Sequence, residues 1–314
     1  MTGTLEILAA GPMLTVQDRG RTGFLRFGVS ASGPMDGEAF AAANALVGNA
    51  PGAAALEFAL TGGRFRASRD VLVAVTGGAM RAEAGGRPLA PWSSARLRAG
   101  EELTVGALRG AVWGYLAVSG GIETPPVKGS RATHLRSAIG GHEGRALRPG
   151  DVLPLGPEPG ALPRQLTRPL RPRHGPIRVV LGPQDDAFAP EILARFLGAS
   201  YAVSAQRDRM ALLLEGPALP AARGHDITSD GTLMGSVQVP LSGRPIVLMA
   251  DRQTTGGFPK IATVITPDLG RLAQIPTGAM LRFHALSVEA AEAEARAAAR
   301  QSAEALADLA PTGA

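Results

Sequence analysis

Apolar residues recur along the chain in short runs of three to eight positions, and glycine pairs separate many of these runs. Runs of this length that are rich in Val, Ile and Leu and bounded by turn residues are typical of β-strands. Residues 5–17 predict two short strands with a turn at Gly11-Pro12. In the rest of the first half, strands are predicted at residues 56–60, 71–76, 95–97, 103–105, 111–118 and 152–155, with turns at Gly62-Gly63, Gly77-Gly78, Gly85-Gly86, Gly120-Gly121 and Gly140-Gly141.

The second half continues this pattern, and short helical stretches interrupt it. Helices are expected where apolar residues recur at helical spacing after a capping residue or a proline. The pattern as a whole favours a mainly β protein built as a barrel or a sandwich. The predicted strands are 177–181, 201–205, 211–214, 235–240, 245–250, 261–265 and 279–284, and the predicted helices are 36–47 (N-cap Asp36), 190–197, 267–273 and 288–309.

Prolines mark the predicted domain boundary. Residues 156–176 contain six prolines and no apolar periodicity, which is typical of an extended linker. We therefore expect a first β domain over residues 1–156, a Pro-rich linker over 157–176, a second β domain over 177–288 and a helical tail over 289–314.

Composition narrows the range of functions. Aromatic residues make up only 4% of the chain, so the cores must consist mainly of Ala, Val, Leu and Ile. The formal charge is +5, but no run of five basic residues occurs, and nucleic acid is not an expected partner. Cysteine is absent, which excludes disulfides and thiolate chemistry. The N-terminus has no signal-peptide pattern and no apolar stretch reaches 18 residues, so we expect a cytoplasmic protein without a membrane partner.

The densest polar cluster follows the predicted strand 245–250 and reads Asp-Arg-Gln-Thr-Thr-Gly-Gly-Phe-Pro-Lys over residues 251–260. A strand end of this kind brings a carboxylate, a guanidinium, an amide and two hydroxyls into one small volume. Glycines there let the backbone turn or approach a ligand closely. The cluster could therefore clamp a small polar molecule. Alternatively, it is a buried salt bridge and a turn that hold two strands together.

A related polar pattern lies near the N-terminus. The order Asp-Arg-x-x-Thr-Gly occurs at residues 18–23 and again at 251–256, through duplication or by chance. A Gly/Ser loop over residues 28–36 then leads into the helix predicted at Asp36. Free amides at that helix start could bind an anion, although an ordinary capped helix explains the same pattern.

Several catalytic motifs are absent from the sequence. It contains no phosphate-binding P-loop, no dinucleotide-binding Gly-x-Gly-x-x-Gly after a strand and no Gly-x-Ser-x-Gly elbow. His134 and His142 have no metal-binding spacing, and we expect no metal site formed by the chain itself. Polar loops without an obvious nucleophile indicate a role in orientation and electrostatic stabilisation.

Nine short motifs occur in fixed order along the chain, at residues 16–23, 32–36, 43–49, 56–57, 120–122, 129–130, 207–210, 238–240 and 251–257. In this order they resemble the biotin-dependent carboxyltransferase family, which includes allophanate hydrolase subunit 2 and KipA-like proteins. The resemblance extends from residue 5 to about residue 288. One departure is Phe258, where the family usually has Tyr.

The resemblance implies two cyclophilin-like β-barrel domains with a few short helices and a C-terminal helix. It also implies a B-type (KipI-like) and an A-type (LamB/YcsF-like) partner subunit. Family members of this size most often help to open 5-oxo-L-proline to L-glutamate, with ATP and Mg bound at a site shared with a partner. The resemblance implies no covalently attached biotin on this chain.

The family positions also imply site residues. Asp18, Asp36 and Asp251 would orient cationic side chains or hold a metal bound to the nucleotide. The expected catalytic residues are Asp251, Arg252, Gln253, Thr254, Thr255 and Lys260, and those expected to bind substrate or nucleotide are Asp18, Arg19, Ser32, Gly33, Asp36, Arg209, Gln238, Gly256 and Gly257.

Two other functions fit the same motifs. One is carboxyl transfer from carboxybiotin to urea or a related amide, which would require a separate biotin carrier and carboxylase. The other is a non-catalytic, KipA-like regulatory module that binds a KipI-like protein. The sequence leaves these alternatives open.

Overall fold

The computed structural model describes residues 3–168, 170, 174–222 and 224–312. Strands account for about twice as many residues as helices (35% against 18%), which confirms the mainly β fold. By its internal contacts the chain divides into two compact units, each assembled from separate segments. The first unit comprises Met1–Arg21, Ser32–Leu170 and Gln301–Ala314, and the second unit comprises Thr22–Ala31 and Arg171–Arg300.

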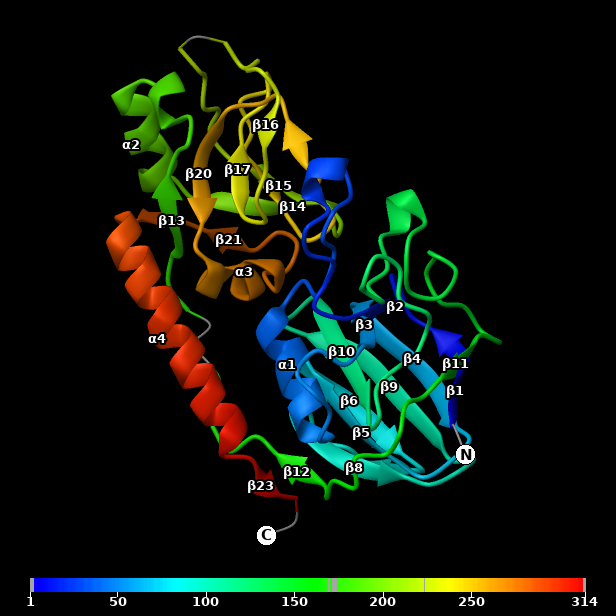
Figure 1. The fold of residues 1–314 in the computed structure, drawn as a ribbon. Helices are drawn as coiled ribbons and strands as arrows, with labels where there is room; N and C mark the ends of the chain where they lie inside the picture. Colours follow the sequence, from blue (N-terminus) through cyan, green and yellow to red (C-terminus); the bar gives the residue numbers. More distant parts are fainter. Residues whose placement is uncertain (1–2, 169, 171–173, 223, 313–314) are drawn as a thin grey trace. The chain divides into compact units, whose positions relative to one another are not determined.

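An antiparallel sheet of six strands forms one layer of the first unit (Figure 1). Its order is β11-β1-β4-β9-β6-β7. Apolar side chains alternate with exposed ones along β9, as expected for a sheet with one face on the core. The strands are β1 (Thr4–Ala10), β4 (Thr61–Ala67), β6 (Ala79–Ala84), β7 (Arg87–Pro88), β9 (Glu102–Arg109) and β11 (Val152–Pro154).

A second sheet of seven strands completes the first unit, in the order β2-β3-β10-β5-β8-β12-β23. Strands β3, β5 and β10 are buried at every position, and helix α1 packs against β5 and β10. Apolar residues of both sheets form one continuous core. The strands are β2 (Thr15–Gln17), β3 (Ala55–Ala59), β5 (Val71–Thr76), β8 (Ser93–Leu97), β10 (Trp113–Val118), β12 (Arg164–Gln165) and β23 (Ala310–Pro311).

Helix α1 (Gly37–Leu46) begins as predicted. The Asp36 side chain accepts a hydrogen bond from Ala39 N at 3.2 Å, which satisfies one of the free amides of the first turn. Phe40 lies edge-on to Tyr115 of β10, with ring centroids 6.0 Å apart. The cap and this aromatic contact fix the start of the helix on the sheet.

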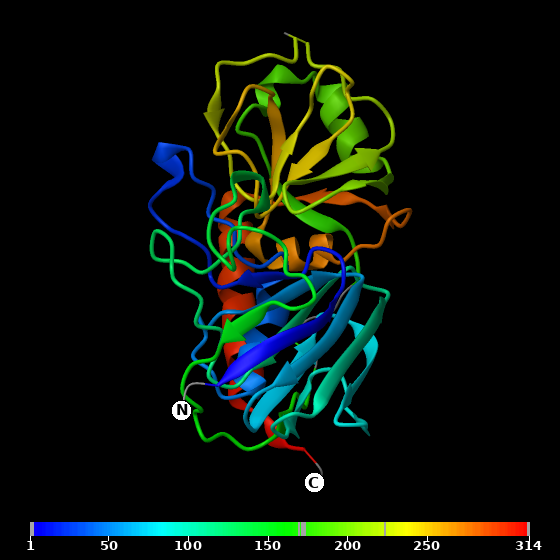
Figure 2. The ribbon, with the colours of Figure 1, turned by 90° about the vertical axis from the view of Figure 1, so that its right-hand side faces the viewer.

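The second unit is built on one eight-stranded, nearly closed barrel-like sheet (Figure 2). Its order is β21-β14-β15-β18-β17-β20-β13-β22, and only Arg282 separates the two end strands in sequence. Phe283 stacks on Phe196 at 4.6 Å between centroids. The strands are β13 (Ile177–Leu181), β14 (Tyr201–Arg207), β15 (Ala211–Glu215), β17 (Ser236–Gln238), β18 (Ile246–Leu248), β20 (Lys260–Val264), β21 (Met280–Leu281) and β22 (Phe283–Ala285).

Shorter elements complete the second unit. A two-stranded ribbon pairs Asp230 with Gly256 and Gly231 with Thr255. Helix α2 begins with proline, as predicted, and α3 has proline in its first turn. The elements are β16 (Asp230–Gly231), β19 (Thr255–Gly256), α2 (Pro190–Gly198) and α3 (Thr266–Ala273), and single 3₁₀ turns occur at Leu25–Phe27, Leu135–Ser137 and Asp185–Ala187.

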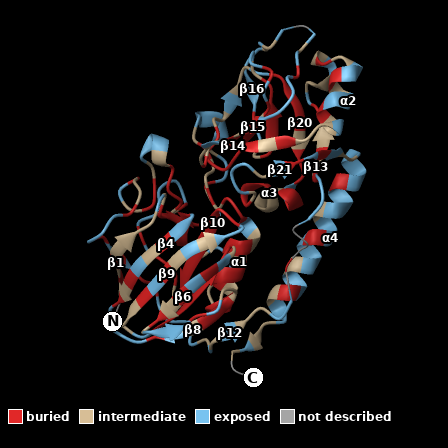
Figure 3. Ribbon diagram, turned by 180° about the vertical axis from the view of Figure 1, so that it is seen from behind, coloured by how far each residue is buried: buried red, intermediate tan, exposed pale blue. Residues whose placement is uncertain are grey.

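The predicted C-terminal helix is present as α4 (Val288–Ala307). Its apolar stripe is narrow, as expected, because Ala291, Ala298 and Ala305 are buried at a spacing of seven residues while most of the helix is exposed (Figure 3). No helix in the described residues combines the length and the apolar character needed to cross a membrane.

Three details differ from the sequence-based expectations. The turn predicted at Gly62-Gly63 was wrong, because both glycines lie inside β4, where a Cβ on Gly62 would lie 2.5 Å from Val105 Cγ1. The strand predicted at 279–284 is two strands. Part of the predicted linker is strand β12, whose proline-free backbone pairs with β8 and β23. The four-part division of the chain stays a prediction.

Candidate functional site

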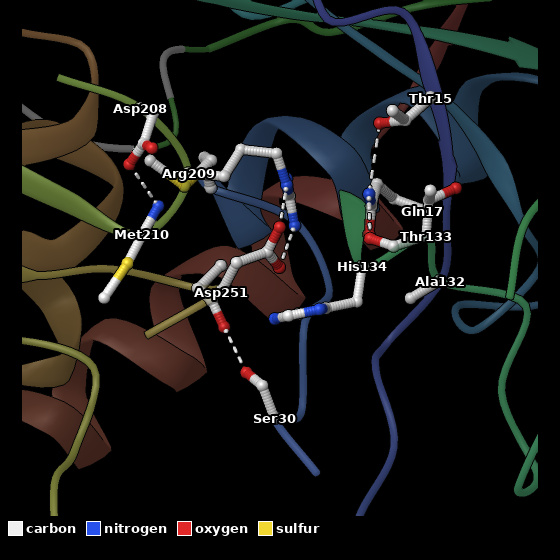
Figure 4. A network of polar contacts seen from close by, with 12 residues as sticks. Thr15, Gln17, Ser30, Ala132, Thr133, His134, Asp208, Arg209, Met210 and Asp251 are labelled. Atoms are coloured by element: carbon white, nitrogen blue, oxygen red, sulfur yellow. Dashed lines mark hydrogen bonds and ion pairs between the residues drawn. The ribbon is translucent and has the colours of Figure 1, made fainter. Parts of the chain in front are cut away.

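The polar segment 251–260 follows strand β18 in the second unit. Asp251 N donates to Arg209 O at 2.8 Å, which continues the pairing of this segment beyond the strand itself. Ser30 donates its hydroxyl to Ala250 O at 3.2 Å (Figure 4). Asp251 and Arg252 are buried, whereas Thr255 is exposed. The segment therefore starts in the protein interior and reaches the surface within five residues.

A buried ion pair fixes the start of this segment. Arg209 Nε donates to Asp251 Oδ2 at 2.9 Å and Nη2 donates to Oδ1 at 3.0 Å (Figure 4). The two side chains are only 2% and 5% exposed. The parallel fork between guanidinium and carboxylate is a strong and directional contact. Asp251 therefore orients a cationic side chain, and the buried salt bridge considered from the sequence is present.

Arg252, the next residue, has no such carboxylate partner in the part of the chain that the structure describes. Its Nε donates to Thr232 O at 3.2 Å, and the residue is 6% exposed. Burial lowers the pKa of the Arg252 guanidinium, because the charged form loses hydration. The structure thus places a positive charge in a poorly hydrated position beside the loop.

Two amide side chains beside this segment form a hydrogen-bonded pair. Gln253 Nε2 donates to Gln238 Oε1 at 3.2 Å, and Gln238 Nε2 donates to Phe258 O at 3.5 Å. A Cβ on Gly256 would lie 2.4 Å from Gln238 Nε2. A side chain at this position would therefore have to displace the Gln238 amide from its place in the pair.

Lys260 ties the end of the segment to the two-stranded ribbon. Its Nζ donates to Asp230 Oδ2 at 2.9 Å, and Gln184 Nε2 donates to the same oxygen at 3.2 Å. The Lys260 side chain is 2% exposed, whereas that of Asp230 is 51% exposed. Hydrogen bonding from Lys260, supported by Gly231 N and Gln184, lowers the pKa of Asp230. The Lys260 ammonium is therefore already engaged by a carboxylate.

Thr254 and Thr255 supply the open donors of the site. Thr254 O accepts a hydrogen bond from Thr232 N at 3.1 Å, so the backbone is fixed there. Among the described residues, neither threonine hydroxyl has a hydrogen-bond partner. Thr255 lies on the exposed strand β19, beside Gly256. Both hydroxyls are thus available to a small polar molecule.

Five predicted site residues lie in the first unit. The buried Asp18 carboxylate accepts hydrogen bonds from Gly20 N at 2.8 Å, from the Ser130 hydroxyl at 2.6 Å and from Arg131 N at 2.5 Å. Arg19 is exposed, and its Nε donates to Pro51 O at 3.3 Å. Asp18 therefore closes a turn, whereas the Arg19 guanidinium extends along the surface.

The Gly/Ser loop in front of α1 rests on this turn. Gly33 has φ +90°, and a Cβ there would lie 3.2 Å from Arg19 O. Ser32 has φ 54°, and its enclosed Oγ has no hydrogen-bond partner in the described part of the chain. The left-handed conformation at two successive residues brings the loop close to the backbone at Arg19.

A buried carboxylate and a phenol bind the backbone at the end of the Gly/Ser loop. Glu57 Oε2 accepts hydrogen bonds from Met35 N and from the Tyr115 hydroxyl, both at 2.8 Å. The Tyr115 hydroxyl in turn accepts one from Asp36 N at 2.7 Å. Burial, together with the nearby Glu57 and Asp36 carboxylates, raises the pKa of Tyr115 well above its usual value. The network fixes two consecutive amides ahead of α1.

Some functional contacts were not predicted from the sequence. Asp230 and Thr232 lie between the predicted strands 211–214 and 235–240, and their partners are about 20 to 30 residues away. Tyr115 and Glu57 were predicted only as strand residues, and Glu57 was also part of a motif. His134 Nδ1 accepts a hydrogen bond from Ser137 N at 3.2 Å. In the part of the chain that the structure describes, no group of three His, Asp or Glu residues could hold a metal ion.

The fold and the motif at residues 251–257 define a class of protein. The sequence profile described as "Carboxyltransferase domain, subdomain A and B" matches residues 27–285. This match covers most of both units, and the chain belongs to that carboxyltransferase-domain family.

Individual relatives carry different names. The chain is 40% identical over 290 residues to the C subunit of 5-oxoprolinase from Escherichia coli (strain K12), covering 91% of this chain and 93% of the relative. It is 30% identical over 315 residues to the "Urea amidolyase" of Lachancea kluyveri, covering 91% of this chain but 17% of the relative. The crystal structure of the K. lactis urea amidolyase superposes with a TM-score of 0.90 at 29% identity, over 96% of this chain and 20% of that one.

Proposed function

We propose that the chain is the C subunit of an ATP-dependent 5-oxoprolinase complex that converts 5-oxo-L-proline to L-glutamate. The observation that carries this proposal is the loop at residues 251–257, in which a buried ion pair fixes the backbone while two threonine hydroxyls stay open. The similarity to the C subunit of the bacterial 5-oxoprolinase over nearly the full length of both chains supports the same assignment.

The chemistry requires activation of a stable amide. The carbonyl carbon of a five-membered lactam is a poor electrophile. Transfer of the γ-phosphoryl group of ATP to the carbonyl oxygen would release ADP and open the carbon to attack by water. Loss of phosphate and cleavage of the ring C–N bond would then give L-glutamate. This chain would hold and orient the ring. Thr254 and Thr255 would donate hydrogen bonds to the developing negative charge, and the amide pair of Gln238 and Gln253 would keep their loop in place. Such preorganised donors act by positioning and electrostatic stabilisation.

Lys260 and Asp251 have supporting roles in this proposal. Each is buried and engaged in an ion pair, so neither is free to transfer a proton without breaking its contact. Lys260 would hold the exposed Asp230 carboxylate in place beside the ribbon. Positioning residues of this kind affect the rate through the geometry of the donors they support.

The remaining components would come from partner subunits. We expect a B-type (KipI-like) and an A-type (LamB/YcsF-like) subunit to complete the site in the cytoplasm. ATP with Mg would bind where a partner contributes residues, since this sequence has no P-loop. The chain would carry no covalent biotin.

The test is reconstitution of the complex. The chain is purified with its candidate A-type and B-type subunits, and glutamate formation and ATP hydrolysis are measured with and without 5-oxo-L-proline. We expect turnover only when all three chains are present, and a fall of roughly tenfold or more in a Thr254→Val, Thr255→Val double variant. Thr104→Val, at an exposed position of β9 in the first unit, is the matched control. A stable complex without 5-oxoproline-dependent turnover would contradict the proposal.

A second candidate function is carboxyl transfer to urea or a related amide. The structural similarity to urea amidolyase, with a TM-score of 0.90, favours this alternative. It predicts activity with urea only when a biotin carrier and a carboxylase are added. The two functions are distinguished by assaying 5-oxo-L-proline with the three-chain complex and urea with the same complex supplemented with a biotin carrier and a carboxylase.

A further inference from the structure

Three arginines of the second unit lose hydration through burial. Arg209 and Arg252 are buried, and Arg207, which contacts the end of α3, is half-buried. A guanidinium remains charged in proteins, so each requires compensation for its lost hydration. The source of that compensation differs among the three residues.

Two of the three are compensated within the chain. Arg209 forms a bidentate ion pair with Asp251. Arg207 donates to Ala273 O at 2.6 Å and to Ile275 O, which are carbonyls at and just beyond the C-terminal end of α3. The C-terminal end of a helix carries a partial negative charge and attracts cations. Both guanidinium groups therefore have a structural explanation.

Arg252 has no such explanation. Within the described residues, its one hydrogen bond runs from Nε to Thr232 O, which is a neutral acceptor. In the described residues no carboxylate lies within ion-pair distance of Arg252, although the preceding residue, Asp251, engages Arg209. Burial is the one cause that shifts the pKa of the Arg252 guanidinium, with no opposing contribution from a neighbouring acid. The chain therefore places a cation beside the loop without its counterion.

We propose that Arg252 binds the carboxylate of the substrate, so that the site selects amides that carry a negative charge. The inference rests on the proposed function and refines it, since 5-oxo-L-proline is a lactam with a carboxylate on the carbon next to its nitrogen. A bidentate contact between guanidinium and carboxylate would supply the missing counterion and set the orientation of the ring. The open Thr254 and Thr255 hydroxyls, two and three residues further along the same loop, would then face the amide.

This arrangement separates the two candidate substrate classes. Urea is neutral and would leave the Arg252 charge uncompensated in a poorly hydrated site, whereas an anionic lactam would neutralise it. Specificity of this kind arises when a buried group is left unpaired by the wrong ligand. The site should therefore favour 5-oxo-L-proline over its uncharged analogue 2-pyrrolidinone, which has the same ring without the carboxylate.

The test uses the reconstituted complex and two ligands that differ only in the carboxylate. For Arg252→Gln we expect the KM for 5-oxo-L-proline to rise about 10- to 100-fold, as for loss of a charge-assisted hydrogen bond. The Ki of 2-pyrrolidinone as a competitive inhibitor should change by less than about threefold, because the amide contacts remain. Arg252→Lys keeps the charge but not the fork and should fall between wild type and Gln.

Arg244→Gln is the matched control, since it removes the same charge from an exposed position of the second unit. It should leave both constants unchanged. The thermal stability of Arg252→Gln should equal or exceed that of the wild type, because the substitution removes an uncompensated charge rather than a structural pair.

Two results would overturn the inference. If the KM for 5-oxo-L-proline and the Ki of 2-pyrrolidinone rise together, Arg252 acts on the amide or on the fold and not on the carboxylate. An unchanged KM for 5-oxo-L-proline would exclude any contact with the substrate. Failure of the proposed function is distinguishable, because it appears as absent turnover in the wild-type complex. Equilibrium binding of radiolabelled 5-oxo-L-proline then decides: binding that is lost in Arg252→Gln supports the inference, and absence of binding refutes it.

Discussion

Replacing Asp251 by Asn removes the carboxylate that neutralises Arg209 while keeping the shape of the side chain. The Arg209 guanidinium, 2% exposed, then loses the bidentate contact with the Asp251 carboxylate. Breaking a buried ion pair in this way costs about 3 to 5 kcal/mol, because the desolvation of the remaining charge is no longer offset. The same change at an exposed pair costs about 0 to 1 kcal/mol. We therefore expect Asp251→Asn to destabilise the second unit by about 3 to 5 kcal/mol.

Amide hydrogen exchange followed by mass spectrometry measures this loss of stability in the second unit separately from the first. Both tryptophans, Trp92 and Trp113, belong to the first unit, so their fluorescence does not report on the second. Peptides that cover β15, β18 and β20 should lose protection corresponding to the full free energy change. Peptides from the first unit should exchange as in the wild type.

Two further variants make the result decisive. Glu292→Gln removes an exposed partner of Arg296 and should lower stability by less than about 0.5 kcal/mol. An Arg209→Met, Asp251→Asn double variant removes both charges of this ion pair, and part of the stability should return. A loss below about 1 kcal/mol in Asp251→Asn, or a double variant no more stable than the single one, would refute the reasoning.

Three other changes test the remaining contacts. Tyr115→Phe should lower the stability of the first unit by about 1 to 3 kcal/mol, because a buried carboxylate loses a donor; tryptophan fluorescence during urea unfolding measures this loss. Gly256→Ala places a Cβ 2.4 Å from Gln238 Nε2 and should reduce turnover of the complex by roughly tenfold, with an unchanged circular dichroism spectrum. Hydrogen bonding from Arg145 lowers the pKa of Asp151 to about 2. Asp151 should therefore contribute about 2 kcal/mol to the free energy of unfolding above pH about 4, and this contribution is lost as the pH falls toward 2. The effect of Asp151→Asn on urea unfolding should accordingly disappear at pH about 2.

Local patterns were enough to predict much of the fold. Strands β5 (Val71–Thr76) and β13 (Ile177–Leu181) coincide with the predicted runs, because their apolar residues are continuous and bounded by turns. The N-cap at Asp36 was also predicted, since capping depends on neighbouring residues alone. The strands that escaped prediction, such as β12 and β23, are two residues long and depend on partners elsewhere in the chain.

The position of the site could be predicted from the sequence, but the ion-pair partners of its residues could not. A run of polar residues after an apolar strand indicated where a site would lie, and the structure places Asp251 at that strand end. The partner of Asp251, however, is Arg209, 42 residues earlier, and that of Lys260 is Asp230. Sequence spacing contains no information about such contacts, because the sheet register sets them. For the same reason, the isolation of Arg252 could be recognised only in three dimensions.

The short link between the end strands of the eight-stranded sheet has a consequence for biosynthesis. Strands β21 and β22 pair with β14 and β13 and are separated in sequence by Arg282 alone. Until β21 and β22 have left the ribosome, β13 and β14 each keep an unpaired edge. Such edges promote association between chains. A nascent or truncated chain that stops before Met280 should therefore aggregate or require a chaperone, whereas residues 280–285 would pair with β14 and β13 and cover both of these edges.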